Sequence, residues 1–139
     1  LTESCKVSDP NGLRDDFEYF KNMGINMALD DFGTEYSSIA LLRKLKPQWI
    51  KIDHTFVRSI QDDEMDQAIL EYIMNLSKQT RIKVCVEGVE NKEILSVVQT
   101  YKPELLQGYY YSRPCPAEEF SKKYFNGKDK TGSYGCLKK

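Results

Sequence analysis

Short, almost continuous apolar runs recur four times along the chain, separated by longer segments in which apolar residues return every three or four positions. Continuous runs are typical of strands buried in a parallel sheet, and the three-to-four spacing is typical of helices with one apolar face. The order helix then strand is repeated four times and is closed by one more helix. The expected strands are residues 25–29, 49–53, 82–87 and 105–111. The expected helices are residues 13–23, 38–44, 62–79, 91–100 and a segment after Pro116 that carries Phe120 and Tyr124.

Repeated helix–strand units predict an α/β fold with a parallel sheet and right-handed crossovers. A barrel of eight such units needs about 200 residues or more, and the chain has 139 residues. We therefore expect about four units, half of a barrel, at residues 1–125. The chain begins at Leu1 without an initiator methionine, which favours a fragment of a longer protein. Residues 126–139 are rich in Gly, Lys, Ser and Thr, so we predict a flexible tail there.

Composition and charge narrow the class of ligand. The chain is 40% hydrophobic and 29% charged with a net charge of −1, so it lacks the basic field that holds a nucleic-acid polymer. A small phosphate ligand would need a metal ion or a well-placed lysine. No apolar run approaches the roughly 20 residues of a membrane span. The four scattered cysteines, with no CxxC motif, favour free thiols in a reducing compartment, and we expect a cytoplasmic location even if the parent protein is anchored to a membrane.

Each apolar run leads to a polar residue of a type that handles metal ions or phosphate. The carboxyl ends of parallel strands meet at one rim of a barrel, so we expect these side chains to converge there. Two adjacent carboxylates repel each other unless a cation lies between them, and oxygen ligands favour Mg²⁺, Mn²⁺ or Ca²⁺. The residues are Asp30 and Asp31 after the first run, Lys51 in the second, Glu87 after the third and Gln107 in the fourth.

The residues of the first two strand ends also have an ordinary structural interpretation. Asp30 and Asp31 could cap a loop and lie in solvent, without any cation. Lys51 either holds phosphate or a water nucleophile at the mouth of the barrel, or is an edge residue with an extended stem that pairs with Asp53. The sequence leaves both interpretations open at each position.

The later strand ends are equally ambiguous when each is taken alone. Glu87 is either a metal ligand or general base, or a strand-end acid followed by Glu90 as a helix-capping acid. Gln107 either orients water or a ligand, or caps its strand. His54 follows the second strand in an exposed position and is not expected to take part. The shared placement at four successive strand ends favours one common site.

Four ordered motifs resemble those of EAL domains, the bacterial phosphodiesterases that open cyclic di-GMP to linear pGpG. They are Asp-Asp-Phe-Gly-Thr-Glu-Tyr-Ser-Ser at residues 30–38, Lys-Ile-Asp at 51–53, Glu-Gly-Val-Glu at 87–90 and Gln-Gly-Tyr-Tyr at 107–110. The opening Leu-Thr-Glu-Ser is similar to the end of the family's Glu-Leu-Thr-Glu segment. The resemblance covers residues 1–124 and implies the C-terminal half of a modified TIM barrel.

The resemblance also implies a role for each strand-end residue. Asp30 would be a ligand shared by two metal ions, Mg²⁺ or Mn²⁺, and Asp31 a ligand of the second ion. Glu87 would be a further ligand that takes part in catalysis, and Lys51 would hold and help activate the attacking water. The other implied roles are Glu3 and Glu90 steadying the loop after Asp31, and Gln107 positioning water or substrate.

Two departures from the family pattern limit these expectations. The Glu-Ala-Leu motif and other metal-binding residues of the family would precede Leu1. Glu35 stands where the family has Gly, which would cost about 1 kcal/mol or more if the backbone there has a positive φ. We expect hydrolysis of cyclic di-GMP by the complete domain. The alternatives are a catalytically silent cyclic di-GMP-binding or regulatory module and, less favoured, a purely structural α/β repeat.

The implied partners are cyclic di-GMP, a second copy that contacts the first through residues 32–38, and sensory or GGDEF domains in the parent protein. The isolated chain should behave differently from a complete domain. Half of a barrel leaves sheet edges and inner strand faces uncovered. We therefore expect the isolated chain to be inactive and either poorly folded or oligomeric.

Overall fold

A single parallel sheet organises the described part of the chain, which in this computed structural model is residues 10–33 and 38–125. The strands are arranged in the order β1-β2-β3-β4, and every neighbouring pair is parallel. Sequence order and spatial order therefore coincide, as in the wall of a barrel. The strands are β1 (Ala28–Phe32), β2 (Trp49–Ile52), β3 (Lys83–Val86) and β4 (Leu105–Leu106).

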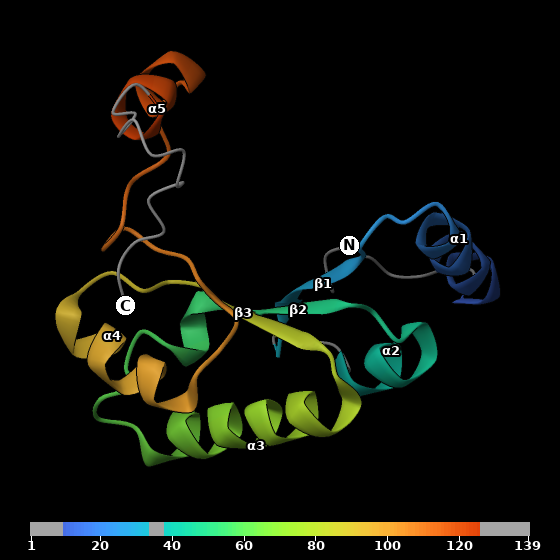
Figure 1. Ribbon diagram of the computed structural model, residues 1–139. Coiled ribbons are helices and arrows are strands. Elements are labelled where there is room, and N and C mark those ends of the chain that lie inside the picture. Colours follow the sequence, from blue (N-terminus) through green and yellow to red (C-terminus); the bar gives the residue numbers. More distant parts are fainter. Residues whose placement is uncertain (1–9, 34–37, 126–139) are drawn as a thin grey trace.

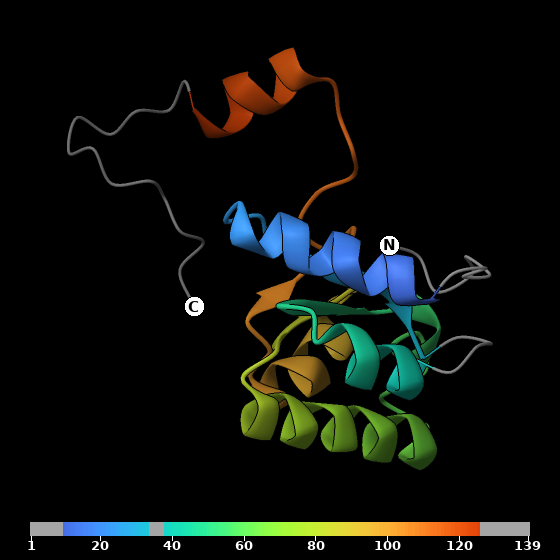
Figure 2. The same ribbon diagram turned by 90° about the vertical axis from the view of Figure 1, so that its right-hand side faces the viewer.

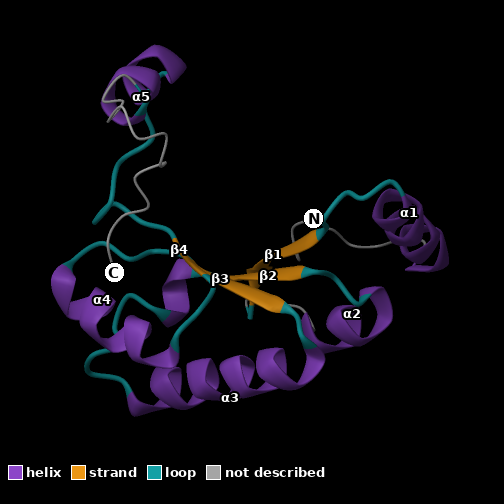
Figure 3. Ribbon diagram, viewed as in Figure 1, coloured by secondary structure: helices purple, strands orange, loops and turns teal. Residues whose placement is uncertain are grey.

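Helices connect the strands and cover one face of the sheet. Figure 1 shows α2, α3 and α4 along that face, with α1 beside the end of the sheet that β1 forms. Figures 2 and 3 show α5 standing apart from the other elements, at the end of an extended connection. The helices are α1 (Pro10–Asn22), α2 (Ser38–Leu45), α3 (Glu64–Thr80), α4 (Lys92–Val98) and α5 (Ala117–Tyr124), and the short 3-10 turns are η1 (His54–Phe56) and η2 (Gln99–Tyr101).

The hydrophobic core lies between the sheet and these helices. Strand residues alternate between the two faces, so every second side chain of β2 points into the core, whereas β1, which is irregular, buries Leu29 and Phe32. The helix α3 contributes its inner face. Lys51, between two buried isoleucines of β2, points from the other face and is only partly buried. The central core residues are Leu29, Ile50, Ile52, Leu70, Ile73, Met74, Val84 and Val86.

The starts of α3 and α4 are fixed by side-chain caps. At α3, Asp63 Oδ1 accepts hydrogen bonds from the backbone N–H groups of Met65 at 2.8 Å and Asp66 at 3.1 Å. At α4, Asn91 Oδ1 accepts from the Ile94 N–H at 2.8 Å. Such caps satisfy N–H groups that have no partner within the helix and are worth about 1 kcal/mol each. In the part of the chain that the structure describes, no helix is both long and apolar enough to cross a membrane.

The sequence predicted the α/β architecture of a partial barrel correctly, but the first strand was placed too early. β1 begins at Ala28 and includes both aspartates, whereas the apolar run begins at Ile25, which is exposed. Gly24, with φ of 77°, ends the preceding helix. The Met27 N–H donates to the side-chain oxygen of Gln48 at 2.8 Å instead of joining the ladder. Residues 25–27 of the apolar run therefore precede the strand, and only residues 28 and 29 of the run belong to β1.

The fourth strand is much shorter than the predicted residues 105–111, because the chain turns away after Leu106. The Gln107 N–H still donates to the Val86 carbonyl at 2.9 Å, but its carbonyl accepts from the Val89 N–H at 3.1 Å. Gly108 lies so close to the Val89 backbone that a Cβ atom could not fit. This close approach bends the chain out of the sheet.

The helices expose several large apolar side chains that the three-to-four spacing predicts on buried faces. They are Phe20 of α1, Ile39 of α2, and Met65 and Tyr72 of α3. The buried residues of α3 include Leu70, Ile73 and Met74. A helix that lies flat on a small sheet buries a narrower stripe than the spacing alone suggests.

Candidate functional site

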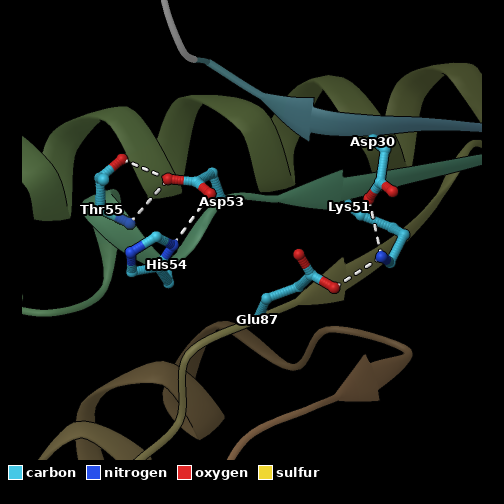
Figure 4. A network of polar contacts seen from close by, with 6 residues as sticks. All are labelled: Asp30, Lys51, Asp53, His54, Thr55 and Glu87. Atoms are coloured by element: carbon cyan, nitrogen blue, oxygen red, sulfur yellow. Dashed lines mark hydrogen bonds and ion pairs between the residues drawn. The ribbon is translucent and has the colours of Figure 1, made fainter. Parts of the chain in front are cut away.

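Lys51 lies between two carboxylates that come from the strands on either side of it. Its Nζ atom is 2.7 Å from Asp30 Oδ1 and 2.6 Å from Glu87 Oε1. Figure 4 shows the ammonium group bridging the two acids at the carboxyl ends of β1, β2 and β3. The side-chain exposures, 32% for Asp30, 28% for Lys51 and 15% for Glu87, leave the cluster open to small solutes. The predicted convergence of these strand ends is therefore present.

Asp31 joins the same cluster because β1 is irregular at this point. The pairing register of β1 with β2 shifts between Leu29 and Phe32, and Asp31 has φ of 54°. Two neighbouring residues of a regular strand point to opposite faces, whereas a bulge re-aims one of them. Aspartate is one of the few residues that tolerate this left-handed conformation. Oxygen atoms of Asp30, Asp31 and Glu87 consequently lie within 4.8 Å of one another.

The positive charge of Lys51 balances part of this acidic cluster. Burial of Lys51 by itself lowers its pKa, but the hydrogen bonds that Lys51 donates to Asp30 and Glu87, together with the charges of both acids, outweigh burial and raise the pKa above its ordinary value. Lys51 therefore carries its proton at neutral pH in the metal-free protein. It can donate hydrogen bonds and provide charge, but it is not a base.

The donor set suits a hard divalent cation. Asp30, Asp31 and Glu87 offer carboxylate oxygens only, and none of them is fully buried. Such oxygen ligands favour Mg²⁺, Mn²⁺ or Ca²⁺ over zinc. Three carboxylates against one ammonium group leave the cluster anionic, and a divalent cation reduces the repulsion among the acids. The residues present therefore fit a metal ion of this class.

Two other predicted site residues, Glu90 and Gln107, form no hydrogen bond or ion pair with these acids among the residues that the structure describes. Glu90 and the Gln107 side chain are exposed, and no hydrogen bond or ion pair from either side chain is observed there. Glu3 lies outside the described residues, as do Glu35 and residues 126–139. The alternative pairing of Lys51 with Asp53 is wrong, because Asp53 turns toward His54 and Thr55 (Figure 4).

Sequence reasoning missed the role of Asp53. Asp53 is only 7% exposed, and its Oδ1 atom accepts hydrogen bonds from the backbone N–H and the hydroxyl of Thr55 at 2.9 Å and 2.5 Å. Burial would raise the pKa of Asp53, but these hydrogen bonds and the contact with His54 hold it below its ordinary value. Asp followed two positions later by Thr is a local capping pattern, and this signal could have identified the turn η1.

The turn η1 is in close contact with Gly88, which follows Glu87, and a pair of substitutions tests this contact. Gly24 and Gly88 have similar φ angles, 77° and 75°, but a Cβ atom at Gly24 would meet no atom within 4 Å. At Gly88 it would overlap His54 Cβ and lie 2.9 Å from His54 Cα. Both alanine substitutions share the left-handed strain of about 1–2 kcal/mol, and only the second adds overlap.

We expect Gly88→Ala to lower the free energy of unfolding by about 2 kcal/mol more than Gly24→Ala does, because overpacking adds about 1–3 kcal/mol to the shared strain. Urea denaturation of the two variants, followed by circular dichroism, measures the difference. Equal losses for the two variants would mean that η1 moves freely away from Gly88.

Comparisons with known proteins agree with this arrangement of residues. The sequence model of the EAL domain matches residues 1–114. The cyclic di-GMP phosphodiesterase NbdA of Pseudomonas aeruginosa is 37% identical over 110 residues, which are 77% of this chain and 14% of that protein. Solved structures with similar folds include the MucR phosphodiesterase of the same organism in complex with c-di-GMP. Its TM-score is 0.77 at 33% identity, over 86% of this chain and 49% of that chain.

A second similar structure was solved with a metal ion. BlrP1 of Klebsiella pneumoniae, in a complex with manganese and c-di-GMP, has a TM-score of 0.77 at 33% identity, over 82% of this chain and 29% of that chain. The present chain spans 14% of the length of NbdA and about half of the MucR structure.

Proposed function

Because this chain belongs to the EAL domain family, we propose that Asp30, Asp31, Lys51 and Glu87 form part of an active site that hydrolyses cyclic di-GMP to linear pGpG with the help of divalent metal ions. The placement of Lys51 carries the proposal. One ammonium group is held at hydrogen-bonding distance from acids on both neighbouring strands, beside a third acid. This combination of fixed positive charge and oxygen ligands is what phosphodiester hydrolysis requires.

Asp30, Asp31 and Glu87 would hold Mg²⁺ or Mn²⁺. Two such ions, when bound, supply a nucleophile at neutral pH and stabilise the attacking and leaving oxygens of an in-line displacement. The acids have a second effect on the substrate, since without cations their negative charge would repel a phosphodiester. Cyclic di-GMP binding should therefore depend on divalent cations, and removal of metal by EDTA should abolish it.

Lys51 contributes orientation and charge. Its two ion pairs fix the ammonium group at the rim, where a phosphate oxygen or a water molecule can accept one of its hydrogen bonds. Lys51 would therefore position the nucleophile through hydrogen bonds and positive charge. Donors that are already in position cost no reorganisation during the reaction.

A hydrolysis assay tests the proposed function directly. The full-length polypeptide that carries these residues should convert cyclic di-GMP to pGpG in the presence of Mg²⁺ or Mn²⁺, with the product measured by chromatography. The isolated 139-residue chain should show no turnover under the same conditions. Metal-dependent binding of cyclic di-GMP without any pGpG would instead support the alternative of a catalytically silent module. Absence of both binding and turnover would contradict both functions.

Other expectations from the family resemblance stay predictions. They include the cytoplasmic location, the sensory or GGDEF domains in the parent protein and the homodimer formed through residues 32–38, of which residues 34–37 lie outside the described part. The roles of Glu3, Glu90 and Gln107 are also still predictions. Gln107 is the most accessible to test, because its backbone is anchored on Val86 while its side chain is exposed at the rim.

A further inference from the structure

We propose that the turn η1, held in shape by Asp53, is a spacer that fixes the separation between the segment after Asp31 and the segment after Glu87, and thereby positions the metal ligands. The use of the metal rests on the proposed function, whereas the geometry rests on contacts among the described residues alone. Asp53 and η1 act as positioning residues in this inference and do not themselves touch metal or substrate.

The first requirement for a spacer is a rigid turn. Asp53 accepts two hydrogen bonds from Thr55 and lies 3.0 Å from His54 Nδ1 through its other oxygen. The backbone closes the turn with hydrogen bonds from the Phe56 N–H to the Asp53 carbonyl at 3.2 Å and from the Val57 N–H to the His54 carbonyl at 3.0 Å. Both Asp53 and Val57 are buried, so the two ends of the turn are anchored in the core.

The second requirement is contact with the segment that follows Asp31. Gly33 comes two residues after Asp31 and has φ of 105°. A Cβ atom at Gly33 would lie only 2.5 Å from Cε2 and 2.8 Å from Cζ of Phe56. The Phe56 ring therefore presses directly against the Gly33 backbone, and it limits how far this backbone can move toward β2.

The third requirement is contact with the segment that follows Glu87. The Glu87 N–H donates to the Ile52 carbonyl at 3.1 Å, so the backbone of Glu87 is still held to β2. One residue later, Gly88 lies against Cα and Cβ of His54 without room for a side chain. The two glycines thus contact two residues of the same three-residue turn, one on each side.

These contacts explain why the acids lie at a fixed separation although no covalent bond or ladder joins β1 to β3. The sheet places β2 between them, and η1 continues from the end of β2 between the two segments. If η1 loses its shape, Asp31 and Glu87 can drift apart while the sheet stays intact. Metal binding is sensitive to such drift, because ligand positions must hold within about 0.5 Å.

A matched pair of cap variants distinguishes positioning from a general loss of stability. Asp53→Ala removes the cap of η1, and Asp63→Ala removes a cap that is similarly bonded at the start of α3. In the full-length polypeptide, we expect Asp53→Ala to weaken Mn²⁺ binding at least tenfold, as measured by electron paramagnetic resonance titration. Asp63→Ala should leave the dissociation constant within twofold. Asp53→Asn keeps an oxygen that can accept the hydrogen bonds from Thr55. Its Mn²⁺ dissociation constant should therefore lie within about threefold of the parent value.

Hydrogen exchange of the metal-free protein provides a readout that does not involve the metal or the substrate. Asp53→Ala should accelerate amide exchange at Glu87 and Gly33 relative to Asp63→Ala, since the turn no longer supports them. This measurement can fail while hydrolysis of cyclic di-GMP stands, and it can succeed if the proposed function is wrong. Unchanged exchange together with unchanged Mn²⁺ affinity in Asp53→Ala would overturn the spacer.

A second pair keeps the test decisive if Asp53→Ala does not fold. Phe56→Leu replaces the ring that contacts Gly33 with a smaller side chain, and Phe17→Leu makes the same change at a buried position of α1. We expect Phe56→Leu to weaken Mn²⁺ binding about fivefold and to accelerate exchange at Gly33, whereas Phe17→Leu should lower stability without either effect. Equal behaviour of the two leucine variants would count against the spacer.

Discussion

Glu87→Gln should weaken Mn²⁺ binding at least about 100-fold, which corresponds to about 2.7 kcal/mol. The substitution keeps the size of the side chain and one of its oxygens, but it removes the charge that attracts the cation. Glu87 is one of three acids whose oxygens lie within 4.8 Å of one another among the described residues, so the substitution removes one of the three negative charges of this cluster. The measurement is an electron paramagnetic resonance titration of the full-length polypeptide with Mn²⁺.

The control for this variant is Glu71→Gln. Glu71 is an exposed acid on α3, away from the carboxyl ends of the strands. This variant changes the net charge by the same amount, so it separates a direct ligand from the general field of the protein. We expect its dissociation constant to stay within twofold of the parent value. A Glu87→Gln protein that binds Mn²⁺ within threefold of the parent would remove Glu87 from the ligand set.

Lys51→Met should lower the turnover of cyclic di-GMP about 100- to 1000-fold while metal binding is retained or becomes tighter. The loss of turnover follows because one preorganised donor of positive charge disappears from the rim. The gain in metal affinity follows because Lys51 neutralises Asp30 and Glu87 in the metal-free protein, at 2.7 Å and 2.6 Å, and its removal leaves both acids to the cation. A loss of turnover without a loss of metal affinity is the result expected for this role.

Lys83→Met is the matched control for Lys51→Met. Lys83 is the first residue of the neighbouring strand β3, at the opposite end of that strand from Glu87, and its Nζ atom lies 5.2 Å from the centre of the Trp49 ring. Steady-state kinetics and Mn²⁺ titrations of both variants should show parent values for Lys83→Met. Turnover within tenfold of the parent in Lys51→Met would mean that another group orients the nucleophile.

The order of the elements could be predicted from the sequence because each element is defined by local periodicity. Continuous apolar runs marked the strands, and the three-to-four spacing marked the helices, including the seventeen-residue α3. The boundaries were less accurate where a side chain competed with the sheet. Gln48 holds the Met27 N–H and so delays β1, and the approach of Gly108 to Val89 ends β4 early. Neither contact can be predicted from the local spacing of apolar residues in the sequence.

The candidate acids and Lys51 could also be identified from the sequence, because a parallel sheet sends the carboxyl ends of its strands to one rim whatever the details of packing. The partners of Lys51 could not be identified from the sequence. Asp53 is two residues away in the chain, whereas Asp30 is 21 residues away, and sequence distance favoured the wrong acid. The register of β2 between β1 and β3 decided the pairing by placing Asp30 and Glu87 on either side of the lysine.

The sequence by itself determined the class of fold, the side-chain types of the candidate site and the family to which the chain belongs, because these depend on residue types and on periodicities a few residues long. Tertiary structure alone decided how Asp31 enters the cluster, through the bulge in β1, and how η1 separates Gly33 from Gly88. Both features depend on contacts between segments that are far apart in the chain. Such contacts form, and contribute to stability, only when the strands are paired in the folded sheet.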